Sequence, residues 1–121
     1  MPTFEQGDVI RVPFPYTDRP IRQHRPALVI SRGGVGAEQQ FLWVLMITSA
    51  DNRRWPGDVD LEGRYADAGL PAPSIIRTAK IATIESAHAG RIGKIDEDLL
   101  GHVLKLVNNT IHAEASAPGQ S

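Results

Sequence analysis

Gly-Asp-Val-Ile-Arg-Val-Pro-Phe, residues 7–14, decides the fold of this chain together with Arg-Pro-Ala-Leu-Val-Ile-Ser, residues 25–31. Both stretches are rich in branched and aromatic side chains, which favour extended backbone. A strand is therefore predicted from Asp8 to Phe14 and another from Pro26 to Ser31. Pro13 cannot donate a ladder hydrogen bond, which indicates an edge position or a bulge at that point.

The rest of the chain continues this pattern and then departs from it. The run Phe41 to Thr48 is the most apolar and is predicted to be the central strand. Shorter strands are predicted at Asp58–Leu61, Ser74–Lys80, Ala82–Glu85 and Arg91–Ile95. Apolar residues then recur at helical spacing, which predicts one helix over residues 97–112 with Asp96 as its N-cap.

Many short strands followed by one amphipathic helix indicate a mainly β, α+β fold. The expected form is a small twisted sheet or half-open barrel whose helix covers one opening. The length of 121 residues fits a single domain, assigned to residues 1–113. Residues 114–121 are small and polar and are predicted to form a flexible tail.

Composition limits the function. The chain has no cysteine, which permits a reducing cytoplasm, and no apolar run long enough to cross a bilayer. We therefore expect a cytoplasmic protein without a membrane partner. A net charge of −1 argues against coating nucleic acid by charge alone. A local basic site remains open, because Arg19, Arg22, His24 and Arg25 fall in one short segment, predicted to be a loop up to residue 24.

The catalytic inventory of the sequence is narrow. Its four histidines fall in no recognised metal-binding motif, and there is no Gly-x-Ser-x-Gly elbow. We therefore expect no metal and no cofactor. An enzyme of this composition would work with Arg, Thr, Ser, Lys or His. That set suits RNA cleavage, because the RNA 2′-hydroxyl is itself the nucleophile and the protein only aligns it, moves protons and stabilises the phosphate.

Several short motifs occur together in a fixed order: Gly7-Asp8-Val9, Arg25-Pro26-Ala27-Leu28-Val29, the strand-end Thr48, Arg77 and Thr83-Ile84. In this order and spacing the chain resembles the MazF/PemK toxin family from about Glu5 to Ile111. The resemblance implies an SH3-like, CcdB-like half-open β-barrel with one C-terminal helix. It also implies a sequence-specific, metal-independent endoribonuclease that cleaves single-stranded RNA such as mRNA, forms a homodimer and is bound by a cognate antitoxin.

The resemblance assigns catalysis to Arg25 and Thr48. Arg25 matches the family arginine that stabilises the phosphate, a task suited to its planar charged fork. Composition alone favours the other reading of Arg25, a strand-end arginine paired with a carboxylate such as Asp8 or Asp18, and the resemblance reverses that preference. Thr48 matches the family threonine that ends the central strand. Its alternative is a hydroxyl that caps the following turn.

Four further residues are candidates for catalysis or RNA contact: Arg77, Lys80, His24 and Ser49. Arg77 matches the arginine of a family Arg-x-Asp pair, but Ala79 stands where the aspartate would be, so the identity of the general base is open. Without the resemblance, Arg77 and Lys80 read as an outward polar strand face, and His24 as an exposed loop histidine.

A second set of residues is predicted to bind RNA: Arg19, Arg22, Arg53, Arg54 and Trp55. Single-strand binders combine cations with aromatic platforms, and Trp55 in a basic loop suits that role, whereas Trp43 is predicted to lie in the core. The alternative function is a non-catalytic binder of the same fold, either a gyrase poison or a decayed toxin that binds only its antitoxin. The helix end lacks the tryptophan that the gyrase poisons carry.

Overall fold

The computed structural model describes residues 3–14 and 23–112, and the side chain of Phe14 is outside that description. The predicted tail, together with Arg19, Arg22 and Asp18, lies outside the described residues. The described elements are β1 (Asp8–Phe14), β2 (Gln23–Val29), β3 (Phe41–Ser49), β4 (Asp58–Asp60), η1 (Glu62–Arg64), β5 (Ser74–Glu85), η2 (Ser86–His88), β6 (Gly90–Lys94) and α1 (Glu97–Ile111). No helix among them is long and apolar enough to cross a membrane.

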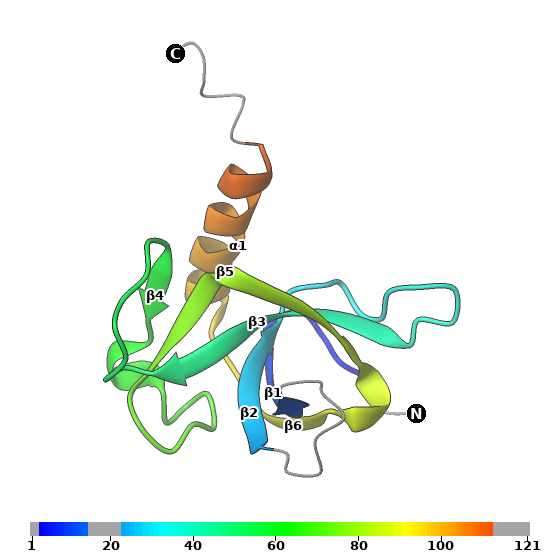
Figure 1. The fold of residues 1–121 in the computed structure, drawn as a ribbon, viewed down its shortest axis with the longest axis horizontal. Coiled ribbons are helices and arrows are strands. Elements are labelled where there is room, and N and C mark those ends of the chain that lie inside the picture. The colour runs from blue at the N-terminus through cyan, green and yellow to red at the C-terminus, as the bar shows by residue number, and fades with distance from the viewer. Residues whose placement is uncertain (1–2, 15–22, 113–121) are drawn as a thin grey trace.

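The described strands form one six-stranded antiparallel sheet in the order β4-β5-β3-β2-β1-β6 (Figure 1). β3 lies between β5 and β2, as predicted for the most apolar run. The two edge strands do not pair, so the curled sheet stays open and the predicted half-open barrel is confirmed. β1 pairs with β6 only over Asp8 to Arg11, so Pro13 faces a partner on the β2 side alone.

Two strands differ from the prediction by more than one or two residues at an end. β2 begins at Gln23 rather than Pro26, because His24 and Arg25 pair with Pro13 and Val12 of β1. His24 and Arg25 are therefore strand residues held in register rather than loop residues. The chain from residue 74 to 85 is one strand rather than the two predicted at Ser74–Lys80 and Ala82–Glu85, and its pairing with β3 has a register shift.

That register shift lies between Leu45 and Ile47 of β3, which pair with Ile81 and Ile76 of β5. Between these partners β5 advances five residues while β3 advances two, so β5 bends away from the regular ladder. The bend contains residues 77–80, which include both basic candidates on this strand. Face assignment by simple alternation cannot hold across it.

The two faces of the sheet have separate cores. One face packs against α1 and the chain around residues 59–70, and its buried residues include Val9, Leu28, Leu45 and Ile47. The other face closes on itself and buries Ile10, Val12, Ala27, Val29, Val44 and Met46. Neighbouring residues of β1, β2 and β3 thus alternate between the cores, as the two-residue period of a strand requires. We call the core beneath α1, which contains Val9, Leu28, Leu45 and Ile47, the helix-side core.

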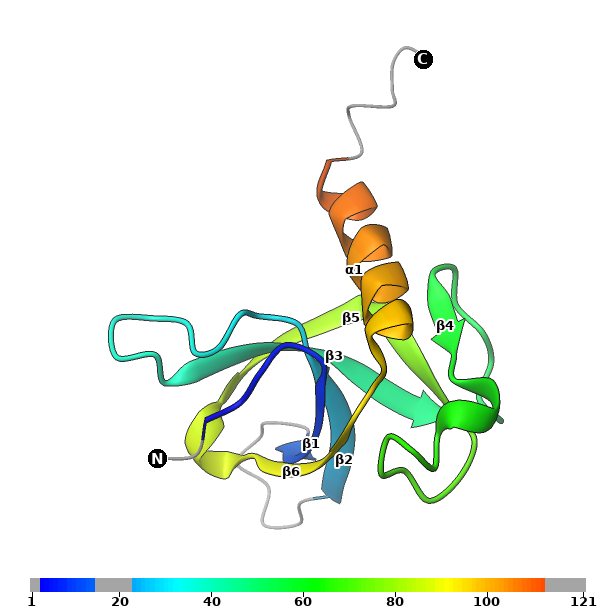
Figure 2. The same cartoon turned by 180° about the vertical axis from the view of Figure 1, so that it is seen from behind.

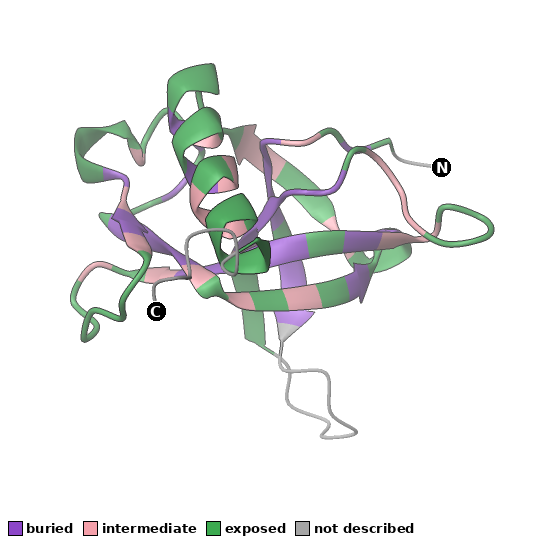
Figure 3. Cartoon of the chain, turned by 90° about the horizontal axis from the view of Figure 1, so that it is seen from above, coloured by how far each residue is buried: buried purple, intermediate pink, exposed green. Residues whose placement is uncertain are grey.

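Only the first half of α1 is anchored on the sheet. Leu99 and Val103 are buried in the helix-side core, whereas Ile111 is 66% exposed. Figures 1 and 2 show the helix rising away from the strands towards its C-terminal end. Figure 3 shows its outward side exposed above the buried parts of the strands.

Trp43 contradicts the prediction that it lies in the core, since it is 46% exposed. Its neighbours Leu42 and Val44 are buried in the core on the face away from α1, so alternation along β3 directs Trp43 to the helix side of the sheet. The helix-side core does not extend to that position. Ile81, at 56% exposure, pairs with Leu45 on the same face, which leaves an exposed apolar patch of Trp43 and Ile81.

The predicted N-cap of α1 is confirmed. The Asp96 carboxylate accepts a hydrogen bond from the Leu99 backbone N–H at 2.8 Å. This bond, assisted by the Arg64 guanidinium at 3.2 Å, holds the pKa of Asp96 below its usual value. The helix dipole also favours a negative charge at this position.

Replacing Asp96 with asparagine is expected to lower the melting temperature at neutral pH, because the charge-assisted part of the cap is lost. A carboxyl whose folded-state pKa is depressed stabilises the fold above its unfolded-state pKa, and that contribution disappears as the pH falls through the folded-state value. The difference between Asp96→Asn and the original chain should therefore shrink towards acid pH. Thermal unfolding followed by circular dichroism over a pH series checks this, and a difference that grows as the pH falls would contradict it.

Candidate active site

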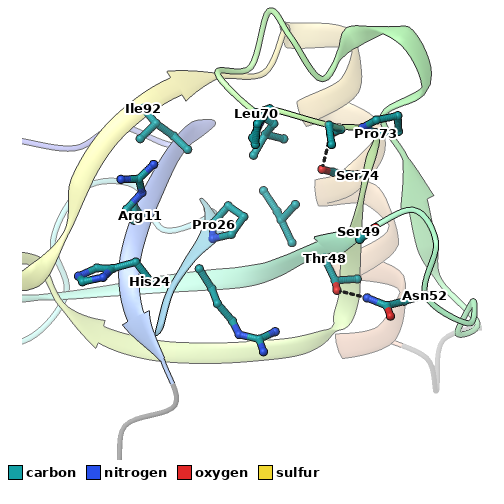
Figure 4. Close-up of a pocket in the computed structure, with 14 residues that line it drawn as sticks. Arg11, His24, Pro26, Thr48, Ser49, Asn52, Leu70, Pro73, Ser74 and Ile92 are labelled. Atoms are coloured by element: carbon teal, nitrogen blue, oxygen red, sulfur yellow. Dashed lines mark hydrogen bonds between the residues drawn. The ribbon is translucent and has the colours of Figure 1, made fainter. Parts of the chain in front are cut away.

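A pocket of about 610 Å³ opens where β1, β2 and β3 leave the helix-side core. Its size is in the range usual for ligand sites. The residues that line it are Arg11, His24, Arg25, Pro26, Ile47, Thr48, Ser49, Asn52, Leu70, Pro71, Ala72, Pro73, Ser74 and Ile92. Figure 4 shows Arg11 and His24 at one side of the pocket and Thr48 with Asn52 at the other. Four predicted site residues, His24, Arg25, Thr48 and Ser49, are therefore brought together.

Strand alternation explains why polar groups collect here. Arg11 follows Val9 at the two-residue spacing, and Pro26 precedes Leu28 in the same way, while Val9 and Leu28 belong to the helix-side core. Arg11 and Pro26 are paired across β1 and β2. The face that is apolar beneath α1 thus becomes basic where the helix no longer covers it.

Arg25 is exposed. Within the described residues its side chain makes one hydrogen bond, from Nη2 to Gln23 Oε1 at 3.2 Å. The alternative pairing of Arg25 with Asp8 is not found. The Asp8 carboxylate instead accepts from Arg91 Nη2 at 2.7 Å and from the Glu5 backbone N–H at 2.8 Å. Asp8 is 2% exposed and serves the N-terminal segment and β6. The Arg25 guanidinium therefore keeps most of its donors for a ligand.

Two roles were considered for a hydroxyl at the end of β3, catalysis and capping of the following turn, and Thr48 and Ser49 differ in which of them they can fill. Ser49 Oγ accepts from the Asp51 backbone N–H at 3.1 Å, so it caps the turn. Thr48 Oγ1 instead accepts from Asn52 Nδ2 at 2.5 Å. A hydroxyl that accepts in this way has its own proton left to donate. The Thr48 O–H can therefore donate to an anionic oxygen in the pocket.

The pocket has a basic side and an apolar side. Arg11, Arg25 and His24 supply the potential positive charge, and the described lining residues include no carboxylate. Leu70, Pro71 and Pro73 form the apolar side with Ile92. Such a site suits a ligand that combines a phosphate with a flat apolar ring system, as a nucleotide does.

Arg11 and Asn52 are the functional candidates that sequence reasoning missed. A charged residue in the middle of the apolar stretch 8–14 was a visible signal for Arg11, but its place in the pocket depends on the β1–β2 register. Asn52 gave no local signal beyond its position four residues after Thr48. Within the described residues, no cluster of three or more His, Asp or Glu side chains could hold a metal ion.

The predicted RNA-binding loop continues from Asn52 beside the pocket. Arg53, Arg54 and Trp55 are all exposed, with Trp55 at 40%. Arg54 donates to Asp60 Oδ2 at 2.9 Å. The pKa of the Asp60 carboxyl lies below its usual value, first because the Glu62 backbone N–H donates to it and second because of Arg54.

Arg77 and Lys80 are not among the residues that line the pocket. Arg77 is 6% exposed, so it is buried rather than part of an outward polar face. Lys80 is partly exposed in the bend of β5. Arg77 and Lys80 therefore do not form the outward polar face considered from the sequence, because the pairing of β5 with β3 shifts register in this segment.

Comparisons with known proteins identify the family of the chain. Residues 5–111 match the family described as PemK-like, MazF-like toxin of type II toxin–antitoxin system. The chain therefore belongs to the PemK/MazF toxin family. Sequence comparison with curated proteins gives no significant match.

Solved structures share the fold at low sequence identity. The chain is similar to MazF in a MazE–MazF crystal structure from Deinococcus radiodurans, at 16% identity and a TM-score of 0.71, over 93% of this chain and 98% of that one. It is similar to an endoribonuclease in complex with its cognate antitoxin from Mycobacterial species, at 16% identity and 0.65, over 88% and 93%. It is also similar to the Mycobacterium tuberculosis toxin MazF-mt6, at 20% identity and 0.61, over 84% and 94%.

Proposed function

We propose that this chain is an endoribonuclease that cleaves single-stranded RNA, mRNA included, at a specific sequence and without a metal ion. It acts as the toxin of a toxin–antitoxin pair in the cytoplasm. The observation that carries the proposal is the convergence of Arg25, Thr48 and His24 on one pocket with a second cation, Arg11. Family membership supports the same reading.

The proposed reaction uses the nucleophile of the substrate. The RNA 2′-oxygen attacks the adjacent phosphorus and loses its proton to a base, while the bond from phosphorus to the 5′-oxygen breaks and that oxygen gains a proton. The products are a 2′,3′-cyclic phosphate and a 5′-hydroxyl. His24 lines the pocket and is the proposed proton acceptor or donor, because an imidazole can accept a proton at one nitrogen and donate from the other.

The cations act on the transition state. Arg25 and Arg11 stabilise the negative charge that grows on the phosphorane oxygens, and the Thr48 hydroxyl donates to one of them. Neighbouring bases lie against the apolar side of the pocket. Strands already hold these groups in place, so they need little reorganisation when the negative charge develops. This lowers the activation free energy of cleavage.

A cleavage assay tests the proposal. Purified protein is incubated with a long, chaperone-unfolded RNA in EDTA, and the ends are mapped by primer extension and by their phosphate chemistry. Discrete cuts at a shared short sequence, with 2′,3′-cyclic phosphate ends, are expected. A folded protein that makes no cuts would overturn the endoribonuclease and leave the binding-only toxin relative, with gyrase inhibition and antitoxin binding as its readouts.

Replacing Asn52 with alanine is expected to lower the rate of cleavage roughly fivefold, because one hydrogen bond that orients the Thr48 hydroxyl contributes about 1 kcal/mol. The loss should be absent in a Thr48→Ala background, where nothing remains to orient. Asn108→Ala, an exposed amide on α1, is the matched control and should retain full activity. Equal losses in both backgrounds would contradict this role for Asn52.

The partners of the relatives suggest partners for this chain. A cognate antitoxin is proposed because the similar structures include MazE–MazF from Deinococcus radiodurans and a Mycobacterial endoribonuclease in complex with its cognate antitoxin. An antitoxin would place an acidic segment over the basic side of the pocket, where it competes with RNA.

A homodimer is also proposed, with Trp43 and Ile81 in the face between the two copies.

Introducing a charge into that apolar patch is expected to separate the dimer. Trp43→Glu places a carboxylate where apolar area would be buried, which opposes association. Light scattering at micromolar concentration should give the mass of a dimer for the original chain and of a monomer for the variant. Trp55→Ala, which removes the other exposed tryptophan, should remain dimeric. A Trp43→Glu variant that keeps the dimer mass would remove this face from the proposal.

A further inference from the structure

Arg77 occupies an unusual place for a cation in a proposed RNA-cleaving protein. It lies on β5 directly opposite Asp58 of β4, and the two side chains are only 7% and 3% exposed. Burying an arginine costs free energy of folding unless its charge is paired and its N–H donors are hydrogen-bonded. The contacts of its guanidinium therefore indicate what it does.

Those contacts go to the loop that leads from β3 to β4 and to Asp58, the first residue of β4. Nη2 of Arg77 donates to the Arg53 carbonyl at 2.8 Å. Its Cζ lies 4.0 Å from the centre of the Trp55 ring, in cation–π geometry. Nη1 lies 3.4 Å from Asp58 Oδ2, and this carboxylate oxygen also accepts from the Trp55 backbone N–H at 2.8 Å.

The next residue of β5 holds the end of the same loop. Thr78 Oγ1 donates to the Gly57 carbonyl at 2.7 Å. Gly57 has a φ of +89°, and a Cβ there would come within 2.7 Å of Thr78 Oγ1, so only glycine suits this turn. Two consecutive β5 residues thus hold Arg53, Trp55 and Gly57 against the sheet.

This arrangement leaves one face of the Trp55 ring on the guanidinium while the side chain remains 40% exposed. Arg53 is exposed too, and its side chain makes no hydrogen bond or ion pair within the described part of the chain. The loop begins beside Asn52, which lines the pocket. Arg53 and Trp55 follow Asn52 by one and three residues, so an RNA strand that runs along this loop from the pocket would meet both side chains.

We propose that Arg77 is a positioning residue that holds Trp55 as a platform for stacking an unpaired RNA base next to the scissile phosphate. The inference rests on the proposed function for its substrate. Arg77 acts through Trp55 and Arg53, and it does not contact the phosphate that is cleaved. A ring that is already fixed loses little freedom when a base stacks on it, which favours binding.

Fluorescence tests the platform without requiring cleavage. The chain has two tryptophans, so Trp43→Phe leaves Trp55 as the only emitter. Single-stranded 2′-O-methyl RNA of mixed sequence, which lacks the attacking hydroxyl, is the probe. Binding should quench Trp55 emission. Absence of quenching by a probe that binds the protein would overturn the platform, even if the protein cleaves RNA.

Arg77→Lys tests the positioning role, because lysine keeps the charge but loses the planar fork and the stacked face. We expect probe affinity to fall roughly tenfold, within the range of roughly 5- to 150-fold that loss of one base–aromatic stack gives on alanine substitution. Trp55→Ala should cause a loss in that range, and Arg77→Lys should add little to it. Arg64→Lys, in an exposed ion pair with Asp96, is the matched control and should bind normally.

The kinetics separate positioning from catalysis. Arg77→Lys is expected to raise KM with kcat retained, because the platform serves binding. A fall in kcat with unchanged KM would overturn the proposal and return Arg77 to a chemical role. A folded protein that does not cleave RNA but shows quenching and the same affinity losses would contradict the endoribonuclease while supporting the platform.

Discussion

Replacing Arg25 with alanine is expected to reduce RNA cleavage roughly 10²–10³-fold, the loss seen when one preorganised donor to a developing negative charge is removed. The guanidinium is exposed at the edge of the pocket and makes one described hydrogen bond, to Gln23. Its removal therefore takes little from the folded state. Arg25→Lys should recover only part of the activity, because it restores the charge but not the fork that spans two phosphate oxygens.

The measurement is the initial cleavage rate in EDTA on one mapped RNA site, with thermal unfolding recorded for each variant. Arg32→Ala is the matched control, since Arg32 is also exposed but lies outside the pocket, and it should keep full activity. Thr48→Ala should lose activity on the same scale as Arg25→Ala. Full activity in a folded Arg25→Ala variant would remove Arg25 from the catalytic role.

Periodicity was enough to predict most of the fold. The β-favouring residues of 8–14, the long apolar run of β3 and the change to helical spacing after Asp96 each follow from local pattern. The strand-end position of Thr48 could be predicted in the same way. Arg25 was identified by its motif, and the structure adds that β1 pairing holds it in a strand.

The remainder depended on pairing that no local pattern contains. Arg11 reaches the pocket only because β1 and β2 place it opposite Pro26. Trp43 was predicted to be core because its neighbours are apolar, yet the core on its own face ends before it. The burial of Arg77 follows from a register shift in β5 and from the short strand β4, whose Asp58 lies opposite it. These features are set by long-range contacts.

Breaking the Asp58–Arg77 pair from one side is expected to destabilise the protein by about 3–5 kcal/mol, because the remaining charge is left buried without its partner. Asp58→Ala should also release the Trp55 backbone N–H, which donates to that carboxylate. Arg77→Met should cost a similar amount through the stranded Asp58. Urea unfolding of both variants, with Arg54→Met as an exposed control for loss of an ion pair, measures the effect.

The double variant Asp58→Asn with Arg77→Met, compared with Asp58→Asn and Arg77→Met alone, separates charge from packing. Asp58 Oδ1 and Arg77 Nη1 have no hydrogen-bond partner within the described residues, so the pair is incompletely satisfied. Removing both charges should therefore cost less than removing either one. Additive losses would show that the two charges do not compensate each other. If instead the double variant recovers stability but not RNA affinity, the pair is maintained for the geometry of Trp55 and Arg53 rather than for the fold.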